Sequence, residues 1–351
     1  MGRKLLWASL VLAPITILLR YAFHVGDTAL FVAAAAALVP LAWLIGEATE
    51  HAGEHTGPGI GGFLNASFGN APELIIALFA VNESLPDVVR GSLAGSVVSN
   101  ILLVLGAALI FGGEGHGGKP LDRFSILLQL GLVLVAVLVF LVPSVPGWTG
   151  DAERHSLAVL SIPVAIVLLL LYAATTIRGL RRHKRLHAES GATAGTGWSL
   201  PVALAVLAAA TVVTALISET LVHSLHSFAE TAGLSQFFIA AVIVAIVGNA
   251  AEHGGAIVIA SRGKLPLATE IAVSSSAQVA LFVTPAVALL AWVVKPALPL
   301  SFRPIELAAM GGAALMVAIL LGDGRGRRWE GFLLVAVYVG VALAFLAAGD
   351  R

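Results

Sequence analysis

The sequence predicts an all-α integral membrane protein with about 11 transmembrane helices, arranged as one N-terminal helix and two inverted five-helix repeats. The first indication is composition: the 351 residues are 58% hydrophobic and only 11% charged, whereas soluble domains carry about 25% charged residues. The formal net charge is zero, and the chain has no cysteine. Nothing therefore indicates nucleic-acid binding, and disulfides and thiolate metal sites are excluded.

The second indication is a series of apolar segments that runs the length of the chain. A bilayer core of about 30 Å requires about 20 residues of helix. The first segment follows Arg3 and Lys4 as a signal peptide would, but it lacks a small-residue cleavage site, so we expect a retained helix. The expected spans are residues 5–23, 29–50, 60–82, 87–112, 123–143, 156–177, 200–222, 235–261, 267–294, 303–322 and 330–348.

Basic residues are divided unevenly between the two sides of this expected bundle. With spans that alternate in direction, 14 of the 20 Lys and Arg residues fall on the side of the N-terminus. Short cytoplasmic loops are enriched in Lys and Arg. The pattern predicts a cytoplasmic N-terminus and an external C-terminus. We expect the protein to lie in the cytoplasmic membrane of a prokaryote.

The third indication is a motif that occurs twice. Residues 69–73 read Gly-Asn-Ala-Pro-Glu, and residues 248–252 read Gly-Asn-Ala-Ala-Glu. Each copy belongs to a set of five spans, and because five is odd, the second set enters the membrane from the opposite face. The expected parts are an N-terminal helix in residues 1–27, a first repeat in 28–177, a basic cytoplasmic linker in 178–198 and a second repeat in 199–351.

Each motif places an amide and a carboxylate within an apolar span, where an ionisable residue is by default a functional-site hypothesis. Asn70 and Glu73 are three residues apart and share a helix face, as do Asn249 and Glu252. One span later, each glutamate is followed by a hydroxyl and an amide spaced four residues apart. These pairs are Ser96 with Asn100, and Ser274 with Gln278.

These oxygen ligands suit a hard cation such as Ca²⁺, which takes about six to eight oxygens, and they include nothing soft. Two ionised glutamates balance either one divalent cation or two protons. Competition between these ions for Glu73 and Glu252 is the physical basis of an antiporter. We therefore expect a secondary transporter that exchanges Ca²⁺, or a similar divalent cation, for H⁺, without a cofactor and not an enzyme. Polar residues can also simply cross-link helices, but two matched copies favour the ion site.

A further acidic set lies one span before each motif. Three acidic residues at spacings of three and four end the second expected span: they are Glu47, Glu50 and Glu54. Glu219 occupies the matching region of the seventh span. We expect Glu50 and Glu219 to serve proton coupling or gating and leave the role of Glu47 open. His253 is either a proton carrier beside the ion site or a packing histidine.

Two other motifs suggest different chemistry. An H-x-x-E-H pattern, typical of zinc peptidases, is formed by His51, Glu54 and His55. We expect the glycines and proline at 57–59 to end that helix, and no third ligand is evident. Residues 113–119 fit G-x-x-x-x-G-K, but Pro120 replaces the Ser or Thr that would hold Mg²⁺, so this segment is interpreted as a glycine-rich connector.

The two motifs resemble the signatures of the Ca²⁺/H⁺ exchangers, the CAX branch of the cation/Ca²⁺ exchanger superfamily. Residues 64–75 resemble the first signature and residues 247–253 the second. Flanking similarity lies in residues 46–50, 218–222 and 278–285. The resemblance implies an eleven-span exchanger that works by alternating access, in which the two signature glutamates bind Ca²⁺ while Glu50 and Glu219 serve proton coupling and gating.

Two departures accompany the resemblance. Pro72 stands where other members more often have a small or β-branched residue, and the basic linker stands where members often carry an acidic helix, so the resemblance implies no acidic regulatory segment here. Rival interpretations are a Na⁺-coupled exchanger, an uncoupled channel and the membrane zinc peptidase.

Overall fold

Helices make up nearly all of the computed structural model, which describes residues 2–114, 119–187 and 197–350. Within this part of the chain, nine helices are long and apolar enough to cross a membrane. A tenth span is formed if the helices on either side of Asn249, which are bent by 58°, count as one. The third expected span, 60–82, is not a single helix, because it is divided between the end of α3 and a short α4.

The first half of the chain contains ten elements. They are α1 (Gly2–Ser9), α2 (Leu12–Tyr21), α3 (Asp27–Phe68), α4 (Ala71–Asn82), α5 (Pro86–Val98), η1 (Ser99–Val104), α6 (Leu105–Gly112), β1 (Lys119–Pro120), α7 (Arg123–Gly147) and α8 (His155–His187). The segment η1 is a π-helical turn that continues α5 into α6, so these three elements form one span.

The second half contains twelve elements. They are α9 (Leu200–Ala232), α10 (Gln236–Phe238), η2 (Ile239–Val244), α11 (Ala245–Gly248), α12 (Ala250–Ser261), α13 (Leu265–Gln278), η3 (Val279–Val283), α14 (Thr284–Val294), α15 (Pro304–Leu320), η4 (Leu321–Asp323), β2 (Arg325–Gly326) and α16 (Arg328–Ala348). Here η2 and η3 are π-helical and η4 is a 3₁₀ turn.

Two helices extend beyond their expected ends. The backbone of α3 stays helical through residues 57–59, where we expected an end. Its 42 residues would extend about 63 Å at about 1.5 Å per residue, so α3 includes the second expected span and the first part of the third. The helix α8 continues to His187, into the expected linker, whose Arg, Lys and Leu residues favour helix. Residues 188–196 of that linker lie outside the described residues.

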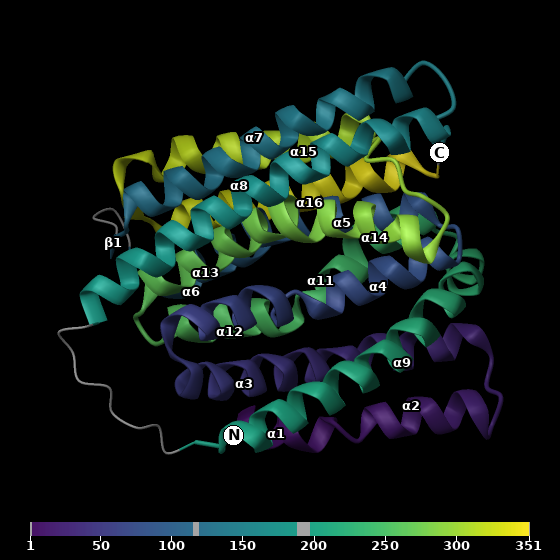
Figure 1. Ribbon diagram of the computed structural model, residues 1–351, viewed down its shortest axis with the longest axis horizontal. Coiled ribbons are helices and arrows are strands. Elements are labelled where there is room, and N and C mark those ends of the chain that lie inside the picture. The colour runs from purple at the N-terminus through teal and green to yellow at the C-terminus, as the bar shows by residue number, and fades with distance from the viewer. Residues whose placement is uncertain (1, 115–118, 188–196, 351) are drawn as a thin grey trace.

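The connections between helices gather at two faces (Figure 1). We call the face where α8 ends and α9 begins the linker face, and the other the opposite face. On the linker face, β1 pairs antiparallel with β2, with Lys119 beside Gly326. On the opposite face, Ser227 near the end of α9 donates to Asp27 at the start of α3, at 2.9 Å. The helix α3 thus starts at the opposite face and its counterpart α9 at the linker face, as an inverted repeat requires.

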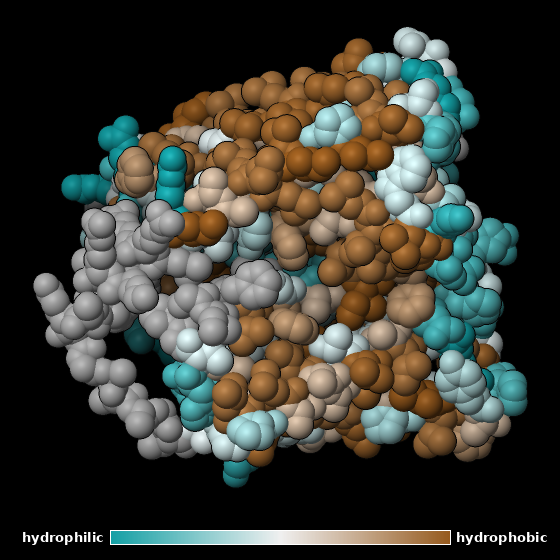
Figure 2. All heavy atoms as spheres, viewed as in Figure 1, coloured by the Kyte–Doolittle hydropathy of each residue, from teal (hydrophilic) through white to brown (hydrophobic). Residues whose placement is uncertain are grey.

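The helices lie in layers in which the broken helices occupy the middle. In Figure 1, α2, α3 and α9 lie at the bottom of the view and α7, α8 and α15 at the top, with α4, α11 and α12 between them. Figure 2 shows hydrophobic side chains over the middle of the molecule and hydrophilic ones toward its two ends. This distribution is typical of a surface that faces lipid between two aqueous layers.

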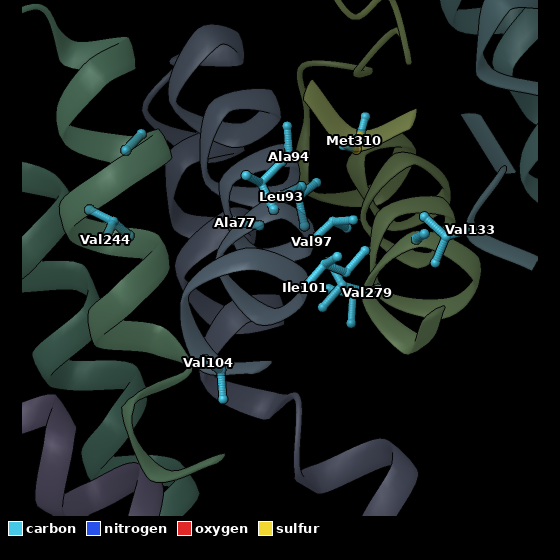
Figure 3. Packing of buried hydrophobic residues seen from close by; sticks show 14 of the residues in the cluster. Ala77, Leu93, Ala94, Val97, Ile101, Val104, Val133, Val244, Val279 and Met310 are labelled. Carbon is cyan, nitrogen blue, oxygen red and sulfur yellow. The ribbon is translucent and has the colours of Figure 1, made fainter. Parts of the chain in front are cut away.

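Among the spans of the described residues, the one formed by α5, η1 and α6 is the most deeply buried, with 83% of its apolar stretch inside the protein. One of its faces presents Leu93, Val97 and Ile101, which lie close to Val279 of η3 and face Met310 of α15 (Figure 3). This packing sets the position of the polar residues that the same span carries.

Two glycines on α5 allow it to approach the second half very closely. A Cβ at Gly95 would lie 2.0 Å from the carbonyl oxygen of Ala241 in η2, and a Cβ at Gly91 would lie 2.9 Å from the ring of Phe237. Small residues spaced four apart permit such backbone approach in membranes. The contact brings the residues that follow Gly95 close to α11, which ends at the break before α12.

Candidate functional site: two broken helices and their glutamates

Both motifs coincide with a break in a helix. Asn70 separates α3 from α4 with φ −99° and ψ 15°, and Asn249 separates α11 from α12 with φ −89° and ψ 8°. The backbone hydrogen bonds match as well: the amide of Leu74 donates to the carbonyl of Asn70 at 3.1 Å, and the amide of His253 donates to that of Asn249 at 2.9 Å. The two motifs therefore have the same local structure, which the sequence repeat predicted.

Each signature glutamate lies in the first turn of the helix that follows a break. Glu73 begins α4 and Glu252 begins α12. The positive end of a helix dipole stabilises a negative charge in its first turn. Pro72 fits this arrangement. The first backbone N–H groups of a helix have no acceptor within the helix, so the missing N–H of a proline in the first turn costs no helical hydrogen bond.

Glu73 is almost enclosed. It is 7% exposed, and its Oε2 atom is buried without a hydrogen-bond partner among the described residues. Beside it lies a cavity of about 10 Å³, room for about one water-sized particle. A Cβ added at Gly248 would stand 3.5 Å from Glu73 Oε1, so the second motif forms one wall for the first glutamate. The cavity is lined by Glu73, Ile76, Ser92, Leu93, Ser96, Val244, Ala245 and Gly248.

Glu252 is half-buried, and Ser275 of α13 donates a hydrogen bond to its Oε2 atom. Glu73 in turn lies against Gly248, which precedes Glu252 in the second motif. One carboxylate thus comes from each half of the chain, and the pair shares one interior region.

The predicted amides pair across the two halves. Asn70 Nδ2 donates to Gln278 Oε1 at 2.7 Å, and Asn100 Nδ2 donates to Asn249 Oδ1 at 3.3 Å. Each bond joins the amide of one motif to the amide that follows the other motif. The four amides selected by spacing alone are therefore brought together in two pairs related by the repeat.

A longer hydrogen-bonded chain runs from His253 to the cavity of Glu73. His253 Nε2 lies 2.9 Å from Asn100 Oδ1, and Asn249 Nδ2 donates to Ser96 Oγ at 2.8 Å. Because Asn100 donates to Asn249 through its amide nitrogen, its Oδ1 atom accepts, and His253 donates from Nε2–H. The side chain of His253 is 7% exposed, so in this state it belongs to the polar interior.

Serines that spacing did not select also contribute. Ser274, predicted as a ligand, donates to the carbonyl of Ile271 in its own helix at 3.1 Å, while its neighbour Ser275 reaches Glu252. Ser92 lines the cavity of Glu73. The run of three serines at 274–276 was a sequence signal for Ser275, and the four-residue spacing between Ser92 and Ser96 was a signal for Ser92. A place for Ser274 in the ion site stays a prediction.

The two residues expected to serve proton coupling or gating lie in different settings. Glu219 of α9 is 38% exposed in its side chain and accepts a hydrogen bond from Arg20 Nη2 at 2.9 Å. Glu50 is exposed on α3. Their functional roles stay predictions.

The zinc-peptidase interpretation does not agree with the contacts of its residues. His51 lies 3.6 Å from Glu47 and 3.3 Å from Glu54, and His55 Nε2 donates to the carbonyl of Trp198 at 2.7 Å. Among the residues that the structure describes, no group of three or more His, Cys, Asp or Glu side chains is arranged to hold a metal.

The chain is similar to known proteins over most of its length. The family described as "Sodium/calcium exchanger protein" matches residues 27–178 and 202–347. The Ca²⁺/H⁺ antiporter ChaA of Bacillus subtilis (strain 168) is 40% identical over 329 residues, which cover 92% of this chain and 93% of that protein. The structure of native YfkE is similar with a TM-score of 0.83 and 36% identity, over 97% of this chain and 99% of that one.

A more distant structure, that of the H⁺/Ca²⁺ exchanger CAX, shares the fold with a TM-score of 0.74 at 17% identity, over 99% of this chain and 91% of that one. The family match extends over both halves of the chain, and the identity to ChaA extends over nearly its whole length. The chain therefore belongs to the sodium/calcium exchanger protein family.

Proposed function

We propose that the chain is a secondary antiporter that exchanges Ca²⁺, or a similar divalent cation, for protons by alternating access. Glu73 and Glu252 hold the ion between the two halves. The observation that carries the proposal is the position of Glu73: its carboxylate lies against Gly248 of the other motif, and its Oε2 atom has no hydrogen-bond partner among the described residues. The name of the ChaA relative supports Ca²⁺ and H⁺ as the exchanged ions.

Charge balance explains why the two ions exchange. A charge placed at the centre of a bilayer costs roughly 2.5–3.5 kcal/mol or more, so an empty pair of ionised carboxylates is the unfavourable state. One divalent cation or two protons removes this cost. If the carrier switches its site from one side of the membrane to the other only when the carboxylate charges are balanced, it carries the divalent cation in one direction and protons in the opposite direction.

The amides and hydroxyls around the pair complete the ligand set. Gln278 Oε1 and Asn249 Oδ1 each accept one amide hydrogen bond, and an amide oxygen has two lone pairs. Each oxygen therefore keeps one lone pair that a cation can use. Ca²⁺ accepts such a mixed shell of carboxylate, amide and hydroxyl oxygens.

The distribution of basic residues supports an orientation with the linker face in the cytoplasm of a prokaryote. In that orientation the N-terminus is inside, the C-terminus is outside, and a proton gradient directed inward would drive Ca²⁺ out of the cell.

Flux measurements in reconstituted vesicles test the proposal. An imposed pH gradient should drive accumulation of radioactive Ca²⁺ by the parent protein, and Glu73→Gln or Glu252→Gln should each abolish it. Glu83→Gln, at an exposed position after α4, is the matched control and should transport normally. Because Ca²⁺ binding displaces protons, the apparent affinity for Ca²⁺ should rise with pH. Proton-driven uptake that survives in both glutamine variants would contradict the assignment, and flux driven only by a Na⁺ gradient would identify a Na⁺-coupled exchanger.

A further inference from the structure

Arg90 is the largest side chain in the described residues that is fully buried, at 1% exposure. It lies in the first turns of α5, within a membrane span. A charged residue in such a place is costly unless it is paired, and it is by default a candidate for function. Nothing in the ion site itself requires this arginine, because its contacts lie near the opposite face.

The guanidinium of Arg90 joins three segments of the chain. Its Nη2 atom donates to Asp87 Oδ1 at 2.9 Å and to Glu153 Oε1 at 2.6 Å, and its Nη1 atom donates to the carbonyl of Pro299 at 3.3 Å. Asp87 belongs to α5, Glu153 to the connection between α7 and α8, and Pro299 to the connection between α14 and α15. The last of these lies in the second half, so the arginine links the halves.

The helix held in this way is the one that carries the ion-site residues. Ser92 follows Arg90 by two residues and Ser96 by six, and both line the cavity of Glu73. Further along the same span, Asn100 bonds to Asn249. Gly95 packs directly on η2. A displacement of the first turn of α5 would therefore also shift the site residues that follow on the same helix. Any movement of α5 away from the two connections would break the bonds of Arg90.

The two glutamates differ in exposure in a way that matches this link. Glu73 is 7% exposed, whereas Glu252 is half-buried. The corresponding position in the second repeat, judged by the offsets of the neighbouring motifs, lies among Ala268, Thr269 and Glu270. None of these is basic, so only one of the two repeats carries an arginine at this position.

We propose that Arg90 is a positioning residue that keeps access to Glu73 from the opposite face closed, and that its bonds to Asp87, Glu153 and Pro299 break when that face opens. The inference rests on the alternating access of the proposed function. It concerns the balance between the two access states and not the identity of the ions.

Cysteine accessibility measures this balance directly, because the chain contains no cysteine. Single cysteines are introduced as Ser92→Cys, beside Glu73, and as Ser274→Cys, in the serine run beside Glu252. The full-length protein is placed in lipid nanodiscs, where both faces are open to solvent, and labelled with a charged methanethiosulfonate in the absence of Ca²⁺. The measured quantity is the rate of labelling.

We expect Arg90→Met to raise the labelling rate of Ser92→Cys about tenfold, as expected when a state populated at a few per cent becomes a major one, and to lower that of Ser274→Cys. A matched control is Arg154→Met, since Arg154 donates to the carbonyl of Pro146 within the α7–α8 region, and labelling should stay at the parent rate. A folded Arg90→Met protein labelled at parent rates, or one in which both cysteines become more reactive, would overturn the proposal, because the second result indicates general loosening.

If Arg90→Met does not fold, the variant Glu153→Gln tests the proposal instead, because it keeps the shape of the Glu153 side chain that accepts from Arg90 and removes its charge. The same opposite changes at the two cysteines should appear, though smaller, and unchanged rates would overturn the proposal. Labelling requires neither Ca²⁺ nor a pH gradient. If the variants show these labelling changes while the parent protein shows no proton-driven flux, the proposed function is refuted and the role of Arg90 remains.

Discussion

Glu73 lies against Gly248: a Cβ atom added at Gly248 would be in van der Waals contact with the Glu73 carboxylate, at 3.5 Å from its Oε1 atom. One motif thus supplies the charged group and the other supplies the space for it. A methyl group there would enter the cavity of about 10 Å³ beside the carboxylate, which is the region where we propose that the cation binds.

We therefore expect Gly248→Ala to weaken Ca²⁺ binding by about tenfold, which corresponds to about 1.4 kcal/mol, because the methyl group would take up space beside the carboxylate that the cation needs. Calorimetric titration of the purified protein measures this. Gly254→Ala is the control, because a Cβ at Gly254 meets nothing within 4 Å, and its affinity should match that of the parent. Equal affinities in the two variants would contradict the placement of the ion beside Gly248.

Removing one carboxylate should stabilise the ion-free protein. Glu73→Gln eliminates a buried charge whose Oε2 atom lacks a hydrogen-bond partner among the described residues, so the melting temperature without Ca²⁺ should rise, increasingly so as the pH rises and the parent carboxylate ionises. Ca²⁺ should raise the melting temperature of the parent, as any ligand of the folded state does, but not that of the variant. A Ca²⁺-induced shift of equal size in both proteins would place the ion elsewhere.

The amides of the site should differ in their contribution to stability. Asn100 contacts both Asn249 and His253, whereas the bond of Gln278 at the site is to Asn70. Interhelical polar contacts in membranes contribute about 0.6–2 kcal/mol each, so Asn100→Ala should destabilise the protein more than Gln278→Ala. Denaturation of the purified variants in mild detergent, monitored by helical content, measures which of the two substitutions lowers stability more.

The control for these two variants is Gln236→Ala, which removes an exposed contact with His226. Its effect on stability should be within about 0.5 kcal/mol of zero. An order in which Gln278→Ala costs more than Asn100→Ala would argue against the hydrogen-bonded chain that begins at His253.

Gly95 should tolerate no side chain. Its Cβ would lie 2.0 Å from the carbonyl oxygen of Ala241, and because that atom is backbone, the two helices would have to separate. Gly95→Ala should cost about 1–3 kcal/mol or more and reduce the yield of folded protein. Gly131→Ala on α7, where a Cβ meets nothing within 4 Å, should fold like the parent, and both are compared by size-exclusion profile and melting temperature.

Arg20 and Glu219 should act as one unit. They form an ion pair at 2.9 Å between α2 and α9, and partly exposed pairs typically contribute about 0–1 kcal/mol. We expect Arg20→Gln and Glu219→Gln to alter Ca²⁺ flux equally, and the double variant to add nothing further. If Glu219→Gln alone changed the number of protons exchanged per Ca²⁺, Glu219 would instead take part in proton coupling by itself.

Much of the fold could be predicted from the chain because hydropathy is a local property. The spans, the repeat and its inversion follow from counting apolar segments, and the spacing of the repeated motif identified four amides that do pair across the halves. The third expected span was not found as one helix, because the same motif that marks the site also breaks the helix at Asn70. The helical extension of α8 to His187 was not predicted, because the Gly, Ala and Thr residues that follow favour a flexible linker, whereas the basic residues before them favour helix.

The sequence alone determined that this is a membrane protein built twice, with an acid and an amide in each copy at matched depth, because composition and spacing are properties of the chain itself. Tertiary structure decided which groups meet: that Ser275 and not Ser274 reaches Glu252, that Glu73 rests against Gly248, and that Arg90 is enclosed among three segments. The reason is that such contacts depend on how far each helix is rotated and how closely two helices approach. Here the close packing of Gly95 on Ala241 sets that approach, across a separation of more than a hundred residues that no local pattern describes.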